Sequence, residues 1–293
     1  MLNADIVKAL LGRQLPDGGF AAQTGGDYRP DATAWAILAL AAAGWEPADL
    51  HAARTRLAAD QLADGRLPLA REHPEAFWPT PPAILAWQGA AGFTAYQVKA
   101  VHFLLASSGQ HFPKKNDSPF GHDTTIRGWS WIDGTHSWVM PSSLAILALT
   151  AAGWGDQERV QEARQLLLNR QLPAGGWNYG NTTVFGQVLH PMPETTGAAL
   201  TALAGCVPTS EVAASLAYLA KRVAQIRTPL SLSWGLLGLA AWGARPRAAE
   251  QWLQECWQRQ ARYGVYDTTA LALLALAWST KDGLCPACRP APA

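Results

Sequence analysis

Charged residues and cysteines are both scarce in this sequence. Charged side chains make up 15% of its 293 residues and leave a formal net charge of +1, with the basic residues scattered along the chain. Binding to nucleic acid needs a basic patch or stripe, so we expect no nucleic-acid partner. Four cysteines in a chain of this length do not indicate a disulfide framework. Because 49% of the residues are hydrophobic, a large apolar core or an apolar ligand site is the better use of this composition.

Long apolar runs are missing as well. The longest, from Ala34 to Trp45, falls short of the roughly 20 residues that a helix needs to cross a bilayer. The segment from Met1 to Gln14 carries Asp5 and Lys8 in a helical pattern and lacks the apolar centre of a signal peptide. We therefore expect a cytoplasmic protein whose contact with membranes is peripheral at most.

One apolar segment type recurs six times along the chain. Each copy begins with an acidic residue or a proline, continues with small or hydroxyl residues, and becomes a dense run of alanine and leucine. The copies begin at Asp31, Pro81, Pro141, Glu194, Pro229 and Asp267. Because they are apolar nearly all round and most end at glycine, these segments predict buried helices with glycine C-caps.

Six amphipathic segments with charge on one face alternate with the apolar ones. They cover roughly Asn3–Arg13, Leu50–Asp60, Thr94–Ser107, Gln157–Arg170, Ser210–Gln225 and Ala248–Gln260. This alternation predicts an all-α (α/α)6 toroid, in which six outer helices surround six inner helices. No window shows convincing period-two alternation, so we expect essentially no sheet. An open helical solenoid is the alternative, but the count of six and the unequal spacing favour a closed ring with long loops at one end.

A ring also favours one domain, over residues 1–280, because dividing it would strip inner helices of their neighbours. Residues 281–293 then form a tail with a single Cys-x-x-C, at Cys285 and Cys288. A structural zinc needs four ligands, so we interpret this pair as tail thiols.

A second repeat follows the outer helices and reads Gln-x-x-x-Gly-x-aromatic. Its copies are Gln14–Phe20, Gln171–Trp177 and Gln260–Tyr266, with Gln61–Leu67 as a copy that ends in leucine. Glycine permits the positive φ of a tight turn, and the glutamine side chain can satisfy free backbone groups at a helix end. Four copies in register are a strong signal of one repeated turn.

This turn repeat, combined with six helix pairs, resembles the squalene-hopene and oxidosqualene cyclases within the squalene cyclase and prenyltransferase repeat superfamily. The resemblance covers the whole chain as architecture and is closest over Gly18–Leu40, GGFAAQTGGDYRPDATAWAILAL. In the cyclases this region carries Asp-x-Asp-Asp-Thr-Ala, whose central aspartic acid protonates an alkene or epoxide. Asp31 falls at the position of that acid, whereas Ala32 replaces the neighbouring aspartic acid.

The resemblance implies a terpenoid cyclase-like protein, a divergent single-barrel member that binds a long apolar isoprenoid, such as a triterpene, in its central cavity. It implies an isomerase that starts cyclisation or isomerisation with an acid and needs no cofactor. Cyclases of this class enclose their substrate between two barrels, so a second cyclase-like barrel or a second copy of this chain is the implied protein partner. The prenyltransferase β subunits hold zinc through an Asp-x-Cys pair and a histidine. No Asp-x-Cys occurs here, so we expect no metal site.

Three acidic residues are the first candidates for catalysis. Asp31, Glu194 and Asp267 begin equivalent apolar segments, and a ring makes the first of these helices the neighbour of the last. Asp31 and Asp267 would then lie close enough to share a proton and supply an acid. The alternative is that each acid only complements its helix dipole, as acids at any helix start do.

The connection from Gly109 to Met140 supplies further candidates. Loops of this length within a domain are usually functional or disordered, and the three tryptophans of this one argue against disorder. His136 and Asp133 form a candidate proton relay, and the aromatic faces of Trp129, Trp131 and Trp138 can stabilise a carbocation. The alternative is that these tryptophans plug one end of the barrel. Other candidate substrate-binding residues near the same end are Tyr28, Trp35, Tyr179 and Tyr266.

Two rival functions remain open. The incomplete acid motif favours a non-catalytic barrel that binds an isoprenoid or lipid, or that docks to a partner. The abundant tryptophans and paired carboxyls also suit a carbohydrate-active (α/α)6 enzyme. An apolar cavity would favour the isoprenoid, and a polar groove with paired carboxyls would favour the sugar.

Overall fold

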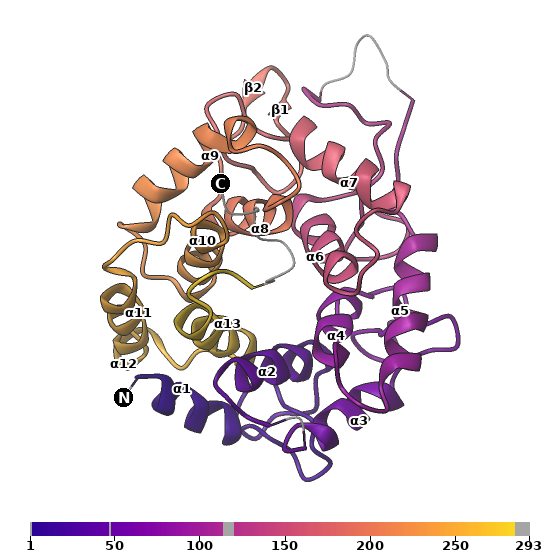
Figure 1. Ribbon diagram of the computed structural model, residues 1–293, viewed down its shortest axis with the longest axis vertical. Coiled ribbons are helices and arrows are strands. Elements are labelled where there is room, and N and C mark those ends of the chain that lie inside the picture. The colour runs from indigo at the N-terminus through magenta and orange to yellow at the C-terminus, as the bar shows by residue number, and fades with distance from the viewer. Residues whose placement is uncertain (1, 47, 114–119, 285–293) are drawn as a thin grey trace.

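Six helices form a closed inner ring in the computed structural model, which describes residues 2–46, 48–113 and 120–284. They are α2 (Pro30–Ala42), α4 (Thr80–Trp87), α6 (Val139–Ala151), α8 (Pro193–Leu203), α10 (Pro229–Ala241) and α13 (Thr268–Ser279). Each packs against the next, and α13 packs against α2, so the ring closes (Figure 1). The prediction of an (α/α)6 toroid is confirmed.

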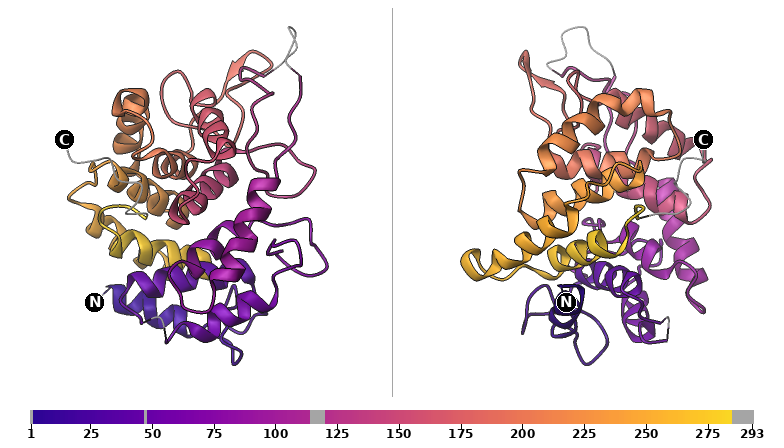
Figure 2. Two further views of the ribbon diagram at one scale, coloured as in Figure 1. Left: turned by 45° about the vertical axis from the view of Figure 1, so that its right-hand side comes forward. Right: turned by 60° about the vertical axis from the view of Figure 1, so that its left-hand side comes forward.

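The amphipathic helices form the outer ring. They are α1 (Leu2–Leu11), α3 (His51–Ala59), α5 (Thr94–Ala106), α7 (Glu158–Asn169), α9 (Thr209–Val223) and α11 (Ala249–Gln258), which leads into the single turn α12 (Gln260–Tyr263). The first helix, α1, packs against the last, α13 (Figure 2). None of the helices in the described ranges is long and apolar enough to cross a bilayer. Cys285 and Cys288 lie outside the described residues.

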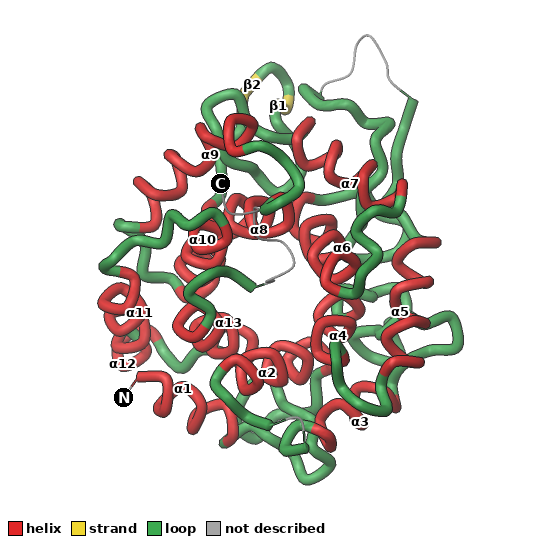
Figure 3. Tube along the Cα trace, in the orientation of Figure 1, coloured by secondary structure: helices red, strands yellow, loops and turns green. Residues whose placement is uncertain are grey.

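A short hairpin contains the only strands within the described part, apart from isolated bridges. Strands β1 (Thr183–Val184) and β2 (Gln187–Val188) pair antiparallel in the connection between α7 and α8 (Figure 3). Phe185 and Gly186 turn the chain between them with positive φ. The sequence predicted essentially no sheet, and the structure adds only this hairpin, with two residues in each strand.

Small residues let the inner helices approach one another closely. A Cβ atom added to Gly197 of α8 would lie 2.1 Å from the carbonyl oxygen of Trp234 on α10. One added to Gly238 of α10 would lie 2.6 Å from the carbonyl oxygen of Gly197. Real Cβ atoms do not approach so closely, which explains why the apolar repeats are rich in glycine and alanine.

A buried hydroxyl ties the start of an inner helix to the chain segment that precedes it. The backbone N–H groups of Phe20, Leu67, Trp129 and Trp177 donate to the hydroxyls of Thr33, Thr80, Ser142 and Thr196, at 2.8, 2.9, 2.9 and 3.0 Å. All four hydroxyl residues are buried. In the last repeat the hydroxyl of Thr268 instead donates to the carbonyl of Ala21, which joins α13 to the first turn.

The Gln-x-x-x-Gly turns join neighbouring outer helices. Gln61 Nε2 donates to the carbonyl of Gly65 at 3.0 Å, and Gln260 Oε1 accepts from the N–H of Tyr266 at 3.0 Å, as the motif predicts. Gly65 and Gly175 have positive φ. Their backbones lie directly against the next outer helix, because an added Cβ would lie 2.1 Å from the carbonyl oxygen of Lys99 and 2.5 Å from that of Ala214.

Alanine at two glycines should separate backbone strain from this close packing. Gly153 also has positive φ but has no neighbour within 4 Å of an added Cβ. We expect Gly153→Ala to lower the free energy of unfolding by about 1–2 kcal/mol, through strain alone. Gly175→Ala should lose about 1–3 kcal/mol more, because α9 must move. Urea unfolding followed by circular dichroism measures both, and equal losses would contradict the packing role of the turn.

Candidate functional site

A cavity of about 260 Å³ lies where the inner helices begin. Five helices contribute their second residue to its lining: Asp31, Met140, Glu194, Leu230 and Thr269. Four of these helices also contribute the residue one turn later, which points the same way: Trp35, Leu144, Trp234 and Leu273. Trp78, Trp131, Tyr179 and Thr195 complete the lining. The helix starts therefore surround one mouth, as a closed ring predicts.

Four tryptophans form two edge-to-face pairs in this lining. The ring centroids of Trp35 and Trp234 are 5.9 Å apart with an interplanar angle of 86°, and those of Trp78 and Trp131 are 6.3 Å apart at 86°. Such pairs are held firmly, because the positive edge of one ring meets the negative face of the other. One methionine and three leucines join the four tryptophans, so most of the lining residues are apolar.

Glu194 is the more deeply buried of the two carboxyls in the cavity. It follows Pro193 in the first turn of α8, where an acid complements the helix dipole, and the residue is 5% exposed. The hydroxyl of Tyr179 donates to Oε1 at 2.9 Å, and that of Ser231 donates to Oε2 at 2.8 Å. Glu194 makes no ion pair within the described residues. Burial, together with the hydrogen bond to Glu194 and its charge, raises the pKa of Tyr179, which keeps that hydroxyl protonated.

Asp31 is held differently. Arg29 Nε donates to Oδ1 at 3.0 Å and Nη2 donates to Oδ2 at 2.9 Å, so one guanidinium engages both carboxylate oxygens. The Asp31 side chain is 16% exposed, and that of Arg29 is 39% exposed. Charge-assisted bidentate pairs of this kind are among the strong hydrogen bonds of proteins.

The structure does not place Asp267 in the position equivalent to Asp31 and Glu194. Asp267 is the N-cap of α13, and its Oδ1 accepts from the N–H of Ala270 at 2.7 Å. It is exposed and does not line the cavity. The sequence alignment of the helix starts was wrong by two residues here, because α13 presents Thr269 at the equivalent place. The carboxyl that joins Asp31 in this cavity is Glu194.

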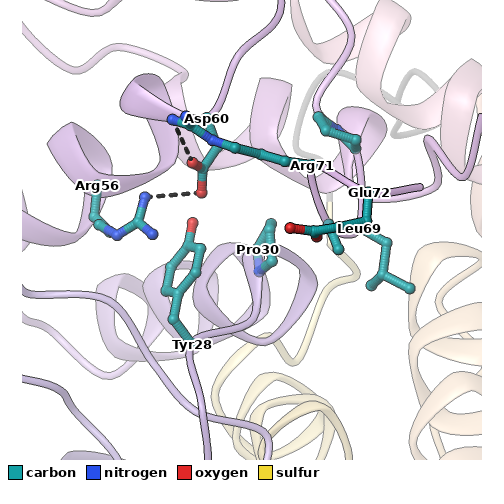
Figure 4. Close-up of a pocket in the computed structure, with 9 residues that line it drawn as sticks. Tyr28, Pro30, Arg56, Asp60, Leu69, Arg71 and Glu72 are labelled. Carbon is teal, nitrogen blue, oxygen red and sulfur yellow. Dashed lines mark hydrogen bonds and ion pairs between the residues drawn. The ribbon is translucent and has the colours of Figure 1, made fainter. Parts of the chain in front are cut away.

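Two predicted binding tyrosines also lie elsewhere. Tyr28 lines a separate cavity of about 210 Å³, where its hydroxyl points toward Asp60 (Figure 4). The guanidinium carbon of Arg56, Cζ, lies 3.7 Å from the centroid of the Tyr28 ring. Burial, and then the charge of Asp60, raises the pKa of Tyr28. The hydroxyl of Tyr266 donates to the carbonyl of Cys256 on α11 at 2.8 Å, which is a structural contact.

The predicted site residues of the long loop before α6 do not lie together. Trp131 lines the apolar cavity, whereas Trp129 is buried in the core and donates from Nε1 to the carbonyl of Leu104 at 2.9 Å. Trp138 and His136 line a third cavity, and exposed Asp133 accepts from the N–H of Gly134 in its own turn. The expected relay of His136 and Asp133 therefore does not face the apolar cavity.

Sequence reasoning missed several cavity residues. They are Trp78, Met140, Leu144, Thr195, Leu230, Trp234, Thr269 and Leu273, and Ser231 as a partner of Glu194. One signal for them was present in the sequence. Trp35 follows Asp31 by four residues, and Trp234 follows Leu230 by four, which predicts that the two helices present equivalent residues to one cavity. In the described part of the chain, no three metal-ligating side chains come together.

Comparison with known proteins adds evidence on the fold alone. The sequence matches no protein-family model and no curated protein. A variant of the type II terpene cyclase MstE from Scytonema, in complex with its substrate geranylgeranyl dihydroxybenzoate, has a TM-score of 0.62 at 14% identity, covering 95% of this chain and 97% of that chain. An inactive variant of an α-1,6-mannanase of Salegentibacter, in complex with α-1,6-mannotriose, has a TM-score of 0.63 at 11% identity, covering 96% and 99%. A protein from Actinoplanes has a TM-score of 0.59 at 19% identity, covering 94% and 99%.

Two serines on α10 should test the hydrogen bonding of Glu194. Ser231→Ala leaves Oε2 of a buried carboxyl without its donor, so we expect a loss of about 1–3 kcal/mol in the free energy of unfolding. Ser233 is the matched control, because its buried hydroxyl has no partner among the described residues. Removing that hydroxyl should be neutral or stabilising. Thermal unfolding of both variants is the measurement, and equal losses would contradict a role for Ser231 in holding Glu194.

Proposed function

We propose that this protein is a terpenoid cyclase-like enzyme. It binds an apolar isoprenoid in the tryptophan-lined cavity and starts cyclisation or isomerisation by protonating a carbon–carbon double bond. The observation that supports this most directly is a buried carboxyl, Glu194, at the edge of an apolar cavity with four tryptophans. A sugar would need a polar groove, whereas the residues around this carboxyl are mostly apolar.

The lining also supports a substrate class. The cavity is slightly smaller than the roughly 300–1,000 Å³ of typical ligand pockets, so a farnesyl-sized chain suits it better than a triterpene. The neighbouring terpene cyclase binds a geranylgeranyl compound, which is consistent with an isoprenoid here. We also propose that a second cyclase-like barrel, or a second copy of this chain, binds at the mouth of the cavity. The substrate would come from a membrane that the protein contacts peripherally.

The surroundings of the two carboxyls favour Glu194 as the proton donor. Both oxygens of Asp31 accept hydrogen bonds from Arg29, so neither is free to donate a proton to a substrate. The partners of Glu194 are hydroxyls, which can accept as well as donate, so Glu194 can carry a proton. The proton adds to one alkene carbon and leaves a cation on the other. The faces of Trp35, Trp78, Trp131 and Trp234 and the charge of Asp31 stabilise that cation until a second double bond attacks it. The cyclised cation then loses a proton to the carboxylate of Glu194, which restores the acid and gives a cyclic isomer of the substrate.

Conservative variants test this assignment with all-trans-farnesol and geranylgeraniol as probes, and with cyclic isomers of the same mass as the readout. We expect Glu194→Gln to lower turnover by roughly 100-fold or more, because a general acid is lost. Its melting temperature should change little, since an amide keeps hydrogen bonds to Tyr179 and Ser231. Asp267→Asn, outside the cavity, is the control and should retain activity. Full turnover by a folded Glu194→Gln protein would refute the assignment, and loss confined to Asp31→Asn would transfer the role to Asp31.

A carbohydrate-active enzyme is the second candidate. Two carboxyls and several tryptophan faces share one cavity, as a glycosidase requires, and the mannanase has a similar fold. Hydrolysis of α-1,6-mannotriose that is lost in Asp31→Asn and Glu194→Gln would favour this candidate.

The ion pair of Asp31 with Arg29 also suits a non-catalytic isoprenoid-binding barrel, which would bind the probes without converting them.

A further inference from the structure

A third cavity, of about 150 Å³, lies between the long loop before α6 and the C-terminal end of α7. Its polar lining includes Arg170, His122 and His136, and its apolar walls are Phe112, Phe120 and Trp138. None of these residues lines the proposed catalytic cavity, so the role of this site is independent of the proposed reaction.

Arg170 is a buried cation in need of a counter-charge. It is 6% exposed, and it forms no ion pair with any carboxylate of the described residues. One guanidinium nitrogen, Nη1, donates to the carbonyl of Ser137, but Nε has no hydrogen-bond partner in the described ranges. Burial lowers the pKa of Arg170 to about 10, so it stays charged at neutral pH. Buried charges are normally paired, and this one faces a cavity.

The repeat supplies an internal comparison. Arg13 precedes Gln14 as Arg170 precedes Gln171, so the two arginines hold the same place beside the same turn. Arg13 donates to the carbonyls of Ala22 and Tyr266 and to the hydroxyl of Thr268. The fold can therefore satisfy an arginine at this position with its own backbone. Arg170 donates to the carbonyl of Ser137 and lines a cavity.

The rest of the lining adds neutral donors and flat apolar walls. Burial, and then the positive charge of Arg170, lowers the pKa of His122 to about 4, so this imidazole is neutral at pH 7. Its Nδ1 is buried and has no partner within the described residues. The rings of Phe120 and His122 lie 5.7 Å apart, and those of Phe112 and His136 lie 5.3 Å apart. Each imidazole is thus held beside a phenyl ring.

We propose that this cavity binds a small aromatic monocarboxylate, with its carboxylate on Arg170 and its ring against the phenylalanines and Trp138. One negative charge balances the one buried guanidinium, and an arginine fork suits a carboxylate. An inorganic phosphate dianion would leave an excess charge in a partly apolar site and would not fill the aromatic walls.

Isothermal titration of the full chain with sodium benzoate tests the proposal. We expect saturable binding to the native protein and a Kd at least about tenfold weaker in Arg170→Gln. Arg164→Gln is the matched control, because Arg164 is an equally buried arginine of α7 that does not line this cavity. It should bind benzoate as the native protein does. Unchanged binding in Arg170→Gln, or an equal loss in Arg164→Gln, would overturn the proposal.

Two further probes identify the ligand chemistry. Benzamide has the same shape without the charge and should bind at least about tenfold more weakly than benzoate, as should inorganic phosphate. Tighter binding of either probe would overturn the assignment to an aromatic carboxylate. If Arg170→Gln fails to fold, Phe112→Ala decides, because Phe112 is 44% exposed and its loss should cost little stability. This variant should weaken the binding of benzoate, and an unchanged Kd would refute the site.

Discussion

Buried hydrogen bonds between backbone N–H groups and the hydroxyls of the inner helices set the geometry of this toroid. An unmade hydrogen bond at a buried amide costs about 1–3 kcal/mol, so Thr33, Thr80, Ser142 and Thr196 fix both the entry and the rotation of their helices. The residue two positions earlier then lines the central cavity in each case: Asp31, Trp78, Met140 and Glu194. In these four repeats, the contact that holds the start of the inner helix therefore also places a side chain at the mouth of the cavity.

Burial and hydrogen bonding give the two carboxyls in that mouth different chemistry, although both occupy the second position of their helices. Asp31 accepts hydrogen bonds from a guanidinium, whereas Glu194 accepts them from two hydroxyls in an apolar surrounding. An acid that protonates an alkene must reach the cavity with its proton in place. In the reaction that we propose, the tryptophan pairs would complete such a site, because their rings exclude water and stabilise positive charge.

The fold could be predicted from the sequence, because each repeat contains the same parts: an apolar inner helix, an amphipathic outer helix and, in most repeats, the Gln-x-x-x-Gly turn. The site followed in part, since Asp31, Trp35, Trp131, Tyr179 and Glu194 do line one cavity. Asp267 did not, because a shift of two residues moves an acid from the inner face of a helix to its exposed N-cap. His136, Asp133 and Trp129 sit in a loop whose path depends on contacts with α5 and α7, and no periodic pattern encodes such contacts.

Deuterium labelling tests the central claim, that the apolar cavity protonates an isoprenoid double bond. The native protein is incubated with all-trans-farnesol in D₂O, and the extracted products are analysed by mass spectrometry. Protonation by a carboxyl in exchange with solvent predicts a cyclic isomer that carries one non-exchangeable deuterium at a new carbon–hydrogen bond. A cyclic product without deuterium would contradict acid initiation. Recovery of unchanged farnesol by a protein that hydrolyses α-1,6-mannotriose would contradict the terpenoid assignment itself.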